Sequence, residues 1–340
     1  MIENFLITFF IAFIVIYALI KLKGIVRLND IPNERSLHTK TIPRSGGLGI
    51  FVSLLIFFVY MNFFDGKNVY LLFSIFMVFL LGFYDDIFSA NPKFKLLVIF
   101  IASLVLSLDG VYLTSLGEYL GFNLTLGFFA IPFTAFAIIG FTNALNLIDG
   151  LDGLAGGVSL IILLAFAHIG NEFDDIVILT LSTGLLGALS AFLFFNWNPA
   201  KIFMGDSGSL TIGFILAVLA LLSSHYIHPV AILYFLAVPV IDTLIVMIRR
   251  IKYQGSPFKA DNTHIHHILN DFFGSAKQTT FFLMMSQAIF CFLGYVVARH
   301  IESYPLGLFP VAMIISFVIL TIMAYMLFTT ILKNKGELKK

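Results

Sequence analysis

The chain has 340 residues, of which 59% are hydrophobic and only 11% are charged, and its mean hydropathy is +1.00. One water-soluble core cannot bury that much apolar surface, so the composition excludes an ordinary soluble protein and predicts an integral membrane protein. The net charge of +1 says little about partners; we expect the lipid bilayer and no nucleic acid. The single cysteine, Cys291, excludes an intrachain disulfide and a cysteine-based metal site.

Eleven apolar runs of spanning or nearly spanning length follow one another along the chain. They are Ile2–Leu22, Leu48–Phe64, Val69–Phe83, Phe94–Leu108, Leu124–Phe141, Leu154–Ile169, Ile176–Phe195, Leu210–Leu222, Val230–Ile248, Thr280–Ala298 and Leu306–Leu332. We therefore predict a single all-α, multi-pass membrane domain over residues 1–340 with about eleven transmembrane helices. The first run has no basic residues before it and no small-residue cleavage site, so we expect it to remain as an anchor.

The positions of lysine and arginine predict the orientation. Connections after the odd-numbered runs, together with the carboxy-terminal tail, hold 18 of the 20 basic residues, and the other connections hold only Lys67 and Arg299. Because basic residues concentrate on the cytoplasmic side, the amino terminus is predicted outside and the carboxy terminus in the cytoplasm. The connections 23–47, 84–94, 142–153, 196–209 and 249–279 are then cytoplasmic, and we expect the active site there.

The first connection and the second carry charges suited to phosphate or metal. Arg44 lies in Pro43–Gly47, where a basic residue beside glycines could hold a phosphate; the alternative is a basic flank that only sets topology. Asp85 and Asp86 stand together at the end of the third run, followed by Lys93 and Lys95. Adjacent carboxylates repel each other, so a metal or a lysine should lie beside them, unless they form a solvated helix terminus.

The stretch Asn143–Gly157 is the centre of the predicted site. Asn143, Asn146, Asp149 and Asp152 recur every three residues, so on a near-helical backbone they lie along one side. Two carboxylates and two amides would then line one cavity, and the glycines among them allow close approach of a ligand. The alternative is a polar, glycine-rich connection between two membrane helices.

Two later connections add further candidates. Asp206 lies between Gly205 and Gly208 at the start of a helix and is the best candidate ligand for a hard cation. In the fifth connection, Arg250 precedes three histidines within four residues, which are His264, His266 and His267. Such a cluster is compatible with zinc, but the oxygen ligands and cations of the neighbouring connections fit magnesium and diphosphate better; a solvated loop is the third possibility.

Two features lie outside these connections. Asp242 falls within the ninth apolar run, where a carboxylate is costly, so we expect a structural pairing with a cytoplasmic Asn or Arg. The segment Asp109–Asn123 is predicted to form a small external hairpin.

Acids and bases around one opening at the membrane edge are how a site holds a metal and a polyphosphate together. We expect Mg²⁺, with Mn²⁺ as the alternative, bound by one or two carboxylates and diphosphate oxygens. A cavity at the lipid boundary favours a lipid phosphate as the second substrate.

These motifs resemble those of a known superfamily, the polyprenyl-phosphate N-acetylhexosamine-1-phosphate transferases, which includes the WecA, TagO and MraY transferases. The resemblance rests on Pro43–Gly47, Gly82–Asp86, Asn143–Gly157, Asn198–Ala200 with Phe203–Asp206, and His264–His267. Eleven runs and the His-Ile-His-His sequence are most similar to the WecA-like branch. The resemblance implies transfer of a HexNAc 1-phosphate from a UDP-sugar to undecaprenyl phosphate in a bacterial inner membrane, with release of UMP, as the initiating step of a cell-envelope polysaccharide.

The resemblance also implies roles for individual residues. Asp206 would bind Mg²⁺, with Asp85 and Asp86 helping at the metal or orienting the lipid phosphate. Asn143, Asn146 and Asp149 would shape the metal and diphosphate site, while Asp152 and Phe203 would shape the uridine pocket. The basic residues and histidines, Arg44, Arg250, His264, His266 and His267, would bind the anionic substrates.

Alternatives to this function stay open. Muramoyl-pentapeptide transferases have three consecutive histidines in the last cytoplasmic loop, whereas Ile265 interrupts the run here; we therefore expect UDP-N-acetylglucosamine as donor, with UDP-MurNAc-pentapeptide as the alternative. An ion-coupled secondary transporter would place its polar residues near the bilayer midplane in two related halves, and this chain has them at one edge. Monomer and homodimer are both compatible with the sequence.

Overall fold

The computed structural model describes residues 1–22, 28–30, 41–63, 66, 68–255, 263–300 and 307–335. Parts of two predicted site connections, residues 23–27, 31–40 and 256–262, lie outside the described residues. The helices are α1 (Ile2–Lys21), α3 (Gly46–Tyr60), α4 (Val69–Phe88), α5 (Pro92–Leu106), α6 (Ala130–Ile148), α7 (Leu154–Glu172), α8 (Ile176–Asn196), α9 (Asp206–Ser223), α10 (Pro229–Phe235), α11 (Ala237–Gln254), α12 (Ile265–Phe273), α13 (Ala276–His300) and α14 (Leu308–Asn334).

The predicted all-α membrane class is confirmed, and every predicted apolar run overlaps a helix, although the fifth run, Leu124–Phe141, begins in the strand Phe122–Thr125 and enters a long helix only at Ala130. Eight helices of the described chain are long and apolar enough to cross a bilayer, and nine if one bent pair counts as a span. Helices α3 and α5 have 15 residues each, about 22 Å at 1.5 Å per residue, which is shorter than a hydrocarbon core of about 30 Å. The number of spans therefore stays a prediction.

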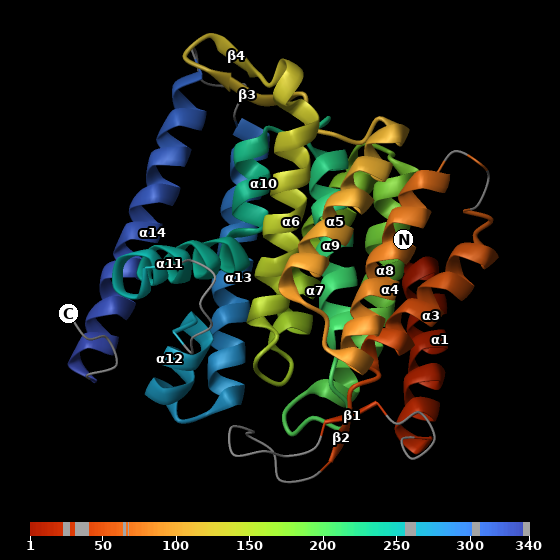
Figure 1. Ribbon diagram of the computed structural model, residues 1–340. Helices are drawn as coiled ribbons and strands as arrows, with labels where there is room; N and C mark the ends of the chain where they lie inside the picture. Colours follow the sequence, from red (N-terminus) through yellow and green to blue (C-terminus); the bar gives the residue numbers. More distant parts are fainter. Residues whose placement is uncertain are drawn as a thin grey trace.

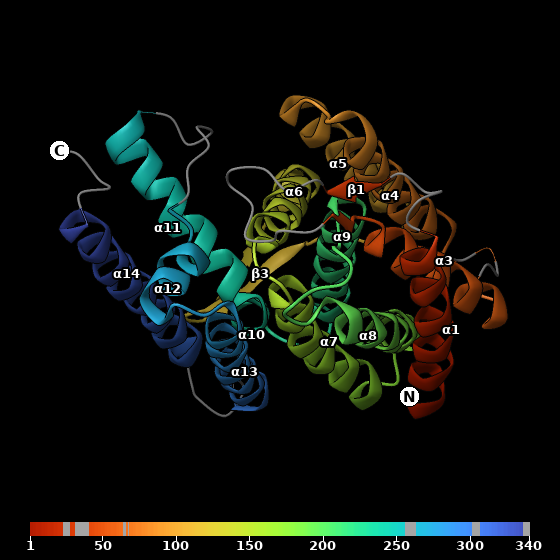
Figure 2. The same cartoon turned by 90° about the horizontal axis from the view of Figure 1, so that it is seen from below.

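Helix α9 forms the centre of the bundle. Its apolar window is 89% buried inside the protein, whereas that of α14 is 11% buried. Helices α3, α4, α6 and α7 contact it, and Figure 2 shows them around it. The residue that begins this helix, Asp206, is therefore held between several other helices.

The ninth predicted run is wrong as a single straight helix. Helices α10 and α11 meet at an angle of 82°, so α11 lies across the bundle in Figure 1. Pro239 gives the reason, because its ring excludes the helical bond to the carbonyl of Phe235. The fully buried Gln287 of α13 compensates, since its Nε2 donates to that carbonyl (2.8 Å) and its Oε1 accepts from the N–H of Val238 (3.1 Å).

Two short two-stranded sheets mark the two ends of the bundle (Figure 1). Strands β3 (Ser115–Tyr119) and β4 (Phe122–Thr125) pair antiparallel, which confirms the predicted hairpin with strands slightly later in the chain; its external position stays a prediction. Strands β1 (Asn29–Asp30) and β2 (Ile42–Pro43) were not predicted. They lie at the same end as α12, and the five predicted site connections meet at that end, as the contacts below show.

Candidate active site

Asp86 fixes the beginning of α9. Its Oδ1 accepts from the backbone N–H of Asp206 (2.8 Å) and its Oδ2 from that of Ser207 (3.0 Å), and its side chain is 0% exposed. Helices leave their first N–H groups without partners, and here a carboxylate of another helix caps them. Gly82, one turn earlier in α4, makes the approach possible, because a Cβ there would overlap the backbone of Asp206.

Asp85 has different partners from Asp86. Lys95 Nζ lies 2.7 Å from Asp85 Oδ2 and 2.6 Å from Asp206 Oδ2, so one cation joins the two carboxylates. Arg44 Nη2 lies 3.4 Å from Asp206 and 3.5 Å from Asp86. Three connections that are far apart in the sequence therefore bring three acids and two bases together, as predicted, and Asp85 and Asp86 face different partners.

Backbone hydrogen bonds hold the Arg44 segment to the segment before α9. The N–H of Phe203 donates to Pro43 (2.8 Å), that of Gly46 to Phe203 (2.9 Å), and that of Gly47 to Met204 (2.8 Å). This ladder sets the position of Arg44 relative to Asp206. Phe203, predicted for the uridine pocket, is half-buried beside it.

The four residues predicted on one side of a helix do not share one helix. Helix α6 ends at Ile148 and α7 begins at Leu154. Asn143 donates to the carbonyl of Ile139 (2.8 Å) and Asn146 to Ser209 Oγ (2.8 Å), which places Asn146 against the first turn of α9. Asp149 and Asp152 lie in the turn between α6 and α7, so they are not aligned with Asn143 and Asn146 along one helix.

Asp149 and Asp152 therefore meet different surroundings. Burial raises the pKa of the Asp149 carboxyl to about 7, and the negative charge of Asp206 adds to the shift. Asp152 instead accepts hydrogen bonds from Asn198 Nδ2 (2.9 Å) and the N–H of Ala200 (3.0 Å). Asp149 thus interacts electrostatically with Asp86 and Asp206, which together with Asp85 form the acidic group. Asp152 instead ties the α6–α7 turn to the connection before α9.

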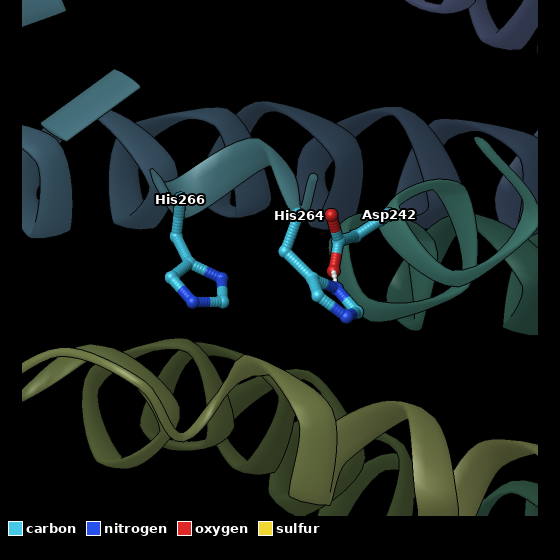
Figure 3. A group of neighbouring side chains, drawn as sticks. All are labelled: Asp242, His264 and His266. Atoms are coloured by element: carbon cyan, nitrogen blue, oxygen red, sulfur yellow. Dashed lines mark hydrogen bonds and ion pairs between the residues drawn. The ribbon is translucent and has the colours of Figure 1, made fainter. Parts of the chain in front are cut away.

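The histidines of the fifth connection pack beside Asp242 (Figure 3). Asp242 Oδ2 lies 2.7 Å from His264 Nδ1, and Oδ1 accepts from the N–H of Ile265 (2.7 Å). The carboxylate of Asp242 is thus paired, as predicted, but its partner is a histidine; the predicted Asn or Arg partner is wrong. Arg250 Nη2 lies 3.5 Å from His264 Nε2.

His266 connects this group to the α6–α7 turn. It is 2% exposed and its ring nitrogens have no hydrogen-bond partner among the described residues. Burial lowers its pKa to about 3, so the ring is neutral. A Cβ on Gly150 would overlap its Nε2 atom, so the ring lies directly against the residue after Asp149. The acidic group and the histidine group therefore face the same turn from two sides. His267 packs against His266, with ring centroids 4.2 Å apart and the ring planes tilted by 43°.

Two groups of side chains have the composition of a metal site. Asp85 and Asp206 each direct a carboxylate oxygen at a single cation, the ammonium group of Lys95. Two carboxylate oxygens that converge in this way suit a hard divalent ion. Asp242, His264 and His266 have ligand atoms that all lie within 4.8 Å of one another, a set typical of zinc. The guanidinium of Arg250 beside His264 opposes a second cation there, so the first group fits a metal better.

A large apolar cavity of about 740 Å³ lies between α6, α9, α10 and α14 under the β3–β4 hairpin. Its lining includes Phe133, Ala137 and Phe141 of α6 and Leu236 at the bend. The cavity is too apolar for phosphate chemistry. It shares α6 with the polar site, because Asn143 follows Phe141 by two residues.

Some site residues were missed or misjudged from the sequence. The sequence offered both Lys93 and Lys95 as partners of the Asp pair; Lys93 is exposed, and Lys95 joins the two carboxylates. Asn196 was not predicted as a site residue; it accepts from the N–H of Gly153 (2.9 Å) and donates to Ile202 (2.8 Å). The sequence signal for this residue is that it flanks a predicted motif.

Comparisons with known proteins identify the family of the chain. Residues 68–224 match the model of glycosyl transferase family 4. A Bacillus subtilis protein named "Probable undecaprenyl-phosphate N-acetylglucosaminyl 1-phosphate transferase" is 35% identical over 77% of this chain and 75% of its own. Proteins named undecaprenyl-phosphate alpha-N-acetylglucosaminyl 1-phosphate transferase are 33% identical in Haemophilus influenzae, over 77% of each chain, and 30% identical in Escherichia coli K12, over 86% of this chain and 82% of that one. The chain therefore belongs to the polyprenyl-phosphate N-acetylhexosamine-1-phosphate transferase superfamily, within glycosyl transferase family 4.

Proposed function

We propose that this protein transfers N-acetylglucosamine 1-phosphate from UDP-N-acetylglucosamine to undecaprenyl phosphate. A phosphate oxygen of the lipid attacks the β-phosphorus of the donor, the bond from that phosphorus to the bridging oxygen breaks, and UMP leaves. The names of the relatives support undecaprenyl phosphate as the acceptor and N-acetylglucosamine 1-phosphate as the transferred group. The observation that carries the proposal is the convergence of Asp85, Asp206, Lys95 and Arg44 at the end of a buried membrane helix.

The charges of the site fit this reaction. Asp85 and Asp206 would hold Mg²⁺, which would neutralise charge on the diphosphate of the donor. Lys95 and Arg44 already lie at these carboxylates and would bind phosphate oxygens of either substrate. Asp86 would act indirectly, because its two oxygens are bound to the backbone that carries Asp206. A lipid phosphate is largely ionised near neutral pH, with a second pKa of about 6, so a strong general base is not required.

The apolar cavity supports a polyprenyl substrate. It is lined by the same helix, α6, that carries Asn143 and Asn146. A phosphate at the polar end of α6 would leave its hydrocarbon tail free to follow this helix into the cavity. The reaction would then take place at the cytoplasmic face of a bacterial inner membrane, the side predicted by the basic residues.

The histidine group supports a donor without a peptide. His264 and His266 are 4% and 2% exposed, and α12 packs against α13 and α14. These contacts leave the described part of this connection compact, and its exposed acid, Asp271, is paired with Lys335 (3.1 Å). UDP-N-acetylglucosamine would be accepted, and a muramoyl-pentapeptide donor would be refused.

The test is Asp206→Asn in purified protein, assayed for UMP release with undecaprenyl phosphate, Mg²⁺ and a panel of UDP-sugars. The amide keeps the shape of the side chain but loses the charge that holds a hard cation, so turnover should be abolished while the protein still inserts and purifies. Asp271→Asn is the matched control, because Asp271 is an exposed acid on α12. Normal Mg²⁺-dependent turnover in Asp206→Asn would remove this residue from the metal role. Transfer only from the pentapeptide donor would move the chain to another branch.

A further inference from the structure

Asp242 uses both of its carboxylate oxygens on the histidine segment, although it lies on another helix. Oδ1 accepts from the N–H of Ile265, the first residue of α12, and Oδ2 lies 2.7 Å from His264 Nδ1. The carboxylate is 2% exposed. Burying a charge is costly unless it is hydrogen-bonded, so both contacts are needed to keep it there. One residue therefore caps α12 and orients the ring that precedes it.

The two neighbours of His264 determine which nitrogen carries the proton. A carboxylate can only accept, so Nδ1 must carry a hydrogen toward Asp242. At the other side of the ring, Arg250 Nη2 can only donate, and it lies 3.5 Å from Nε2. Nε2 must then be bare for the contact to be favourable. The arrangement selects the neutral Nδ1–H tautomer. The carboxylate of Asp242 thereby orients the imidazole of His264, and the imidazole orients the guanidinium of Arg250.

The bend between α10 and α11 is what makes this arrangement possible. Helix α11 runs across the bundle after the 82° bend, and both Asp242 and Arg250 lie on it, at 5 and 13 residues after its first residue. Figure 3 shows the rings of His264 and His266 pointing from α12 toward the ribbon of α6 and the turn that follows it. The direction is that of Gly150, which contacts His266, and therefore of Asp149.

We propose that Asp242 is a positioning residue that holds His264 as the Nδ1–H tautomer, so that Nε2 accepts from Arg250 and aims its guanidinium at the diphosphate of the donor. The role of Arg250 rests on the proposed function, whereas the tautomer does not. In this arrangement His264 does not transfer a proton to the substrate. The guanidinium of Arg250, oriented by the ring, would bind phosphate oxygens of the donor.

The first experiment observes the tautomer directly. Protein labelled with ¹⁵N-histidine in lipid is studied by solid-state NMR, and the His264→Gln spectrum identifies the His264 signals among the eight histidines. We expect a protonated Nδ1 and a bare Nε2. A bare Nδ1 in the unmodified protein would overturn the proposal, as would stoichiometric zinc in the purified protein whose removal shifts the His264 signals. This measurement is decisive even if the proposed reaction is wrong.

The second experiment tests Asp242→Asn. The amide can donate to Nδ1, so the proton should move to Nε2, where it faces the donor Nη2 of Arg250. We expect kcat/KM for the UDP-sugar to fall about 10- to 100-fold, the size typical of a lost orienting partner, with the Mg²⁺ dependence unchanged. Asp271→Asn on α12 should change neither activity nor the His264 signals.

A double variant separates positioning from a purely structural role. If Asp242 acts through His264, adding Asp242→Asn to His264→Gln should lower kcat/KM by less than about threefold, because residues that act as a unit are not additive. A full additive loss in the double variant would overturn the proposal. So would a swapped tautomer in Asp242→Asn with unchanged kcat/KM, because orientation of Arg250 would then not matter.

Discussion

Asp85 and Asp86 are neighbours in the sequence, yet the structure predicts different consequences for the same substitution at each. In Asp86→Asn, one oxygen that caps α9 becomes an NH₂ group facing a backbone N–H of Asp206 or Ser207. Leaving one buried N–H without a partner costs about 1–3 kcal/mol of unfolding free energy. In Asp85→Asn, Oδ1 can still accept from the N–H of Ala90 (2.6 Å) and Lys95 keeps Asp206, so no backbone N–H loses its partner and the loss should be about 1 kcal/mol.

Thermal unfolding in detergent measures this difference. A thiol-reactive fluorophore reports unfolding through the buried Cys291. At about 2 °C per kcal/mol, the lower end for large domains, Asp86→Asn should lower Tm by about 2–6 °C and Asp85→Asn by about 2 °C or less. Turnover, followed by UMP release at several Mg²⁺ concentrations, should fall in both variants. The Mg²⁺ requirement should rise chiefly in Asp85→Asn, and neither loss should reach that of Asp206→Asn.

Two results would refute this reasoning. An unchanged Tm in Asp86→Asn would mean that its carboxylate does not cap α9 in the membrane. Equal and complete losses of turnover at both positions, with equal Mg²⁺ dependence, would argue that both carboxylates bind one metal.

Three further predictions follow from the site, the cavity and the topology. Because the pKa of Asp149 is about 7 and a cation favours the ionised form, Mg²⁺ affinity should increase from pH 6 to pH 8, by up to about tenfold per unit, and this pH dependence should disappear in Asp149→Asn. Ala137→Trp fills the cavity and should raise KM for long polyprenyl phosphates more than for short ones. Phe136→Trp, on the exposed side of α6, is the control and should not do so. Equal changes in KM in the two variants would exclude the cavity as the site of the lipid tail. With the native cysteine replaced, an impermeant external reagent should label Glu118→Cys but not Lys201→Cys, and the reverse would invert the topology.

The convergence of the five connections could be predicted because it follows from chain order alone. If the spans alternate in direction, connections after odd-numbered spans must lie on one side, and polar residues in them must face water or one another. The chemistry of Asp85 and Asp206 follows from residue type. The identity of their partner does not, because choosing between Lys93 and Lys95 requires knowing that α5 begins at Pro92 and which side of it faces α9.

The bend between α10 and α11 could not be predicted from the sequence. Pro239 indicates a break in the helix, but prolines also occur in straight or weakly kinked membrane helices when neighbouring residues bind the backbone groups that proline leaves without a hydrogen bond. Here the neighbour is Gln287, almost fifty residues later, and its amide serves the carbonyl of Phe235 and the N–H of Val238 on the two sides of the bend. The histidine partner of Asp242 was missed for the same reason, because a straight ninth helix would have placed this carboxylate inside the bilayer.

Asp206 and His264 both lie where helices begin, and this position has a physical cause. Within the hydrocarbon region a helix satisfies its own backbone, so free N–H groups occur where helices begin. In this chain two helices begin at the site with acids from other helices on their first N–H groups: Asp86 on α9 and Asp242 on α12. Each capped helix begins with, or directly after, a residue proposed to serve the reaction, Asp206 or His264. The same carboxylates that stabilise the helix ends thereby fix the positions of the reactive side chains, so that a substitution at either cap should disturb activity even though neither acid needs to touch a substrate.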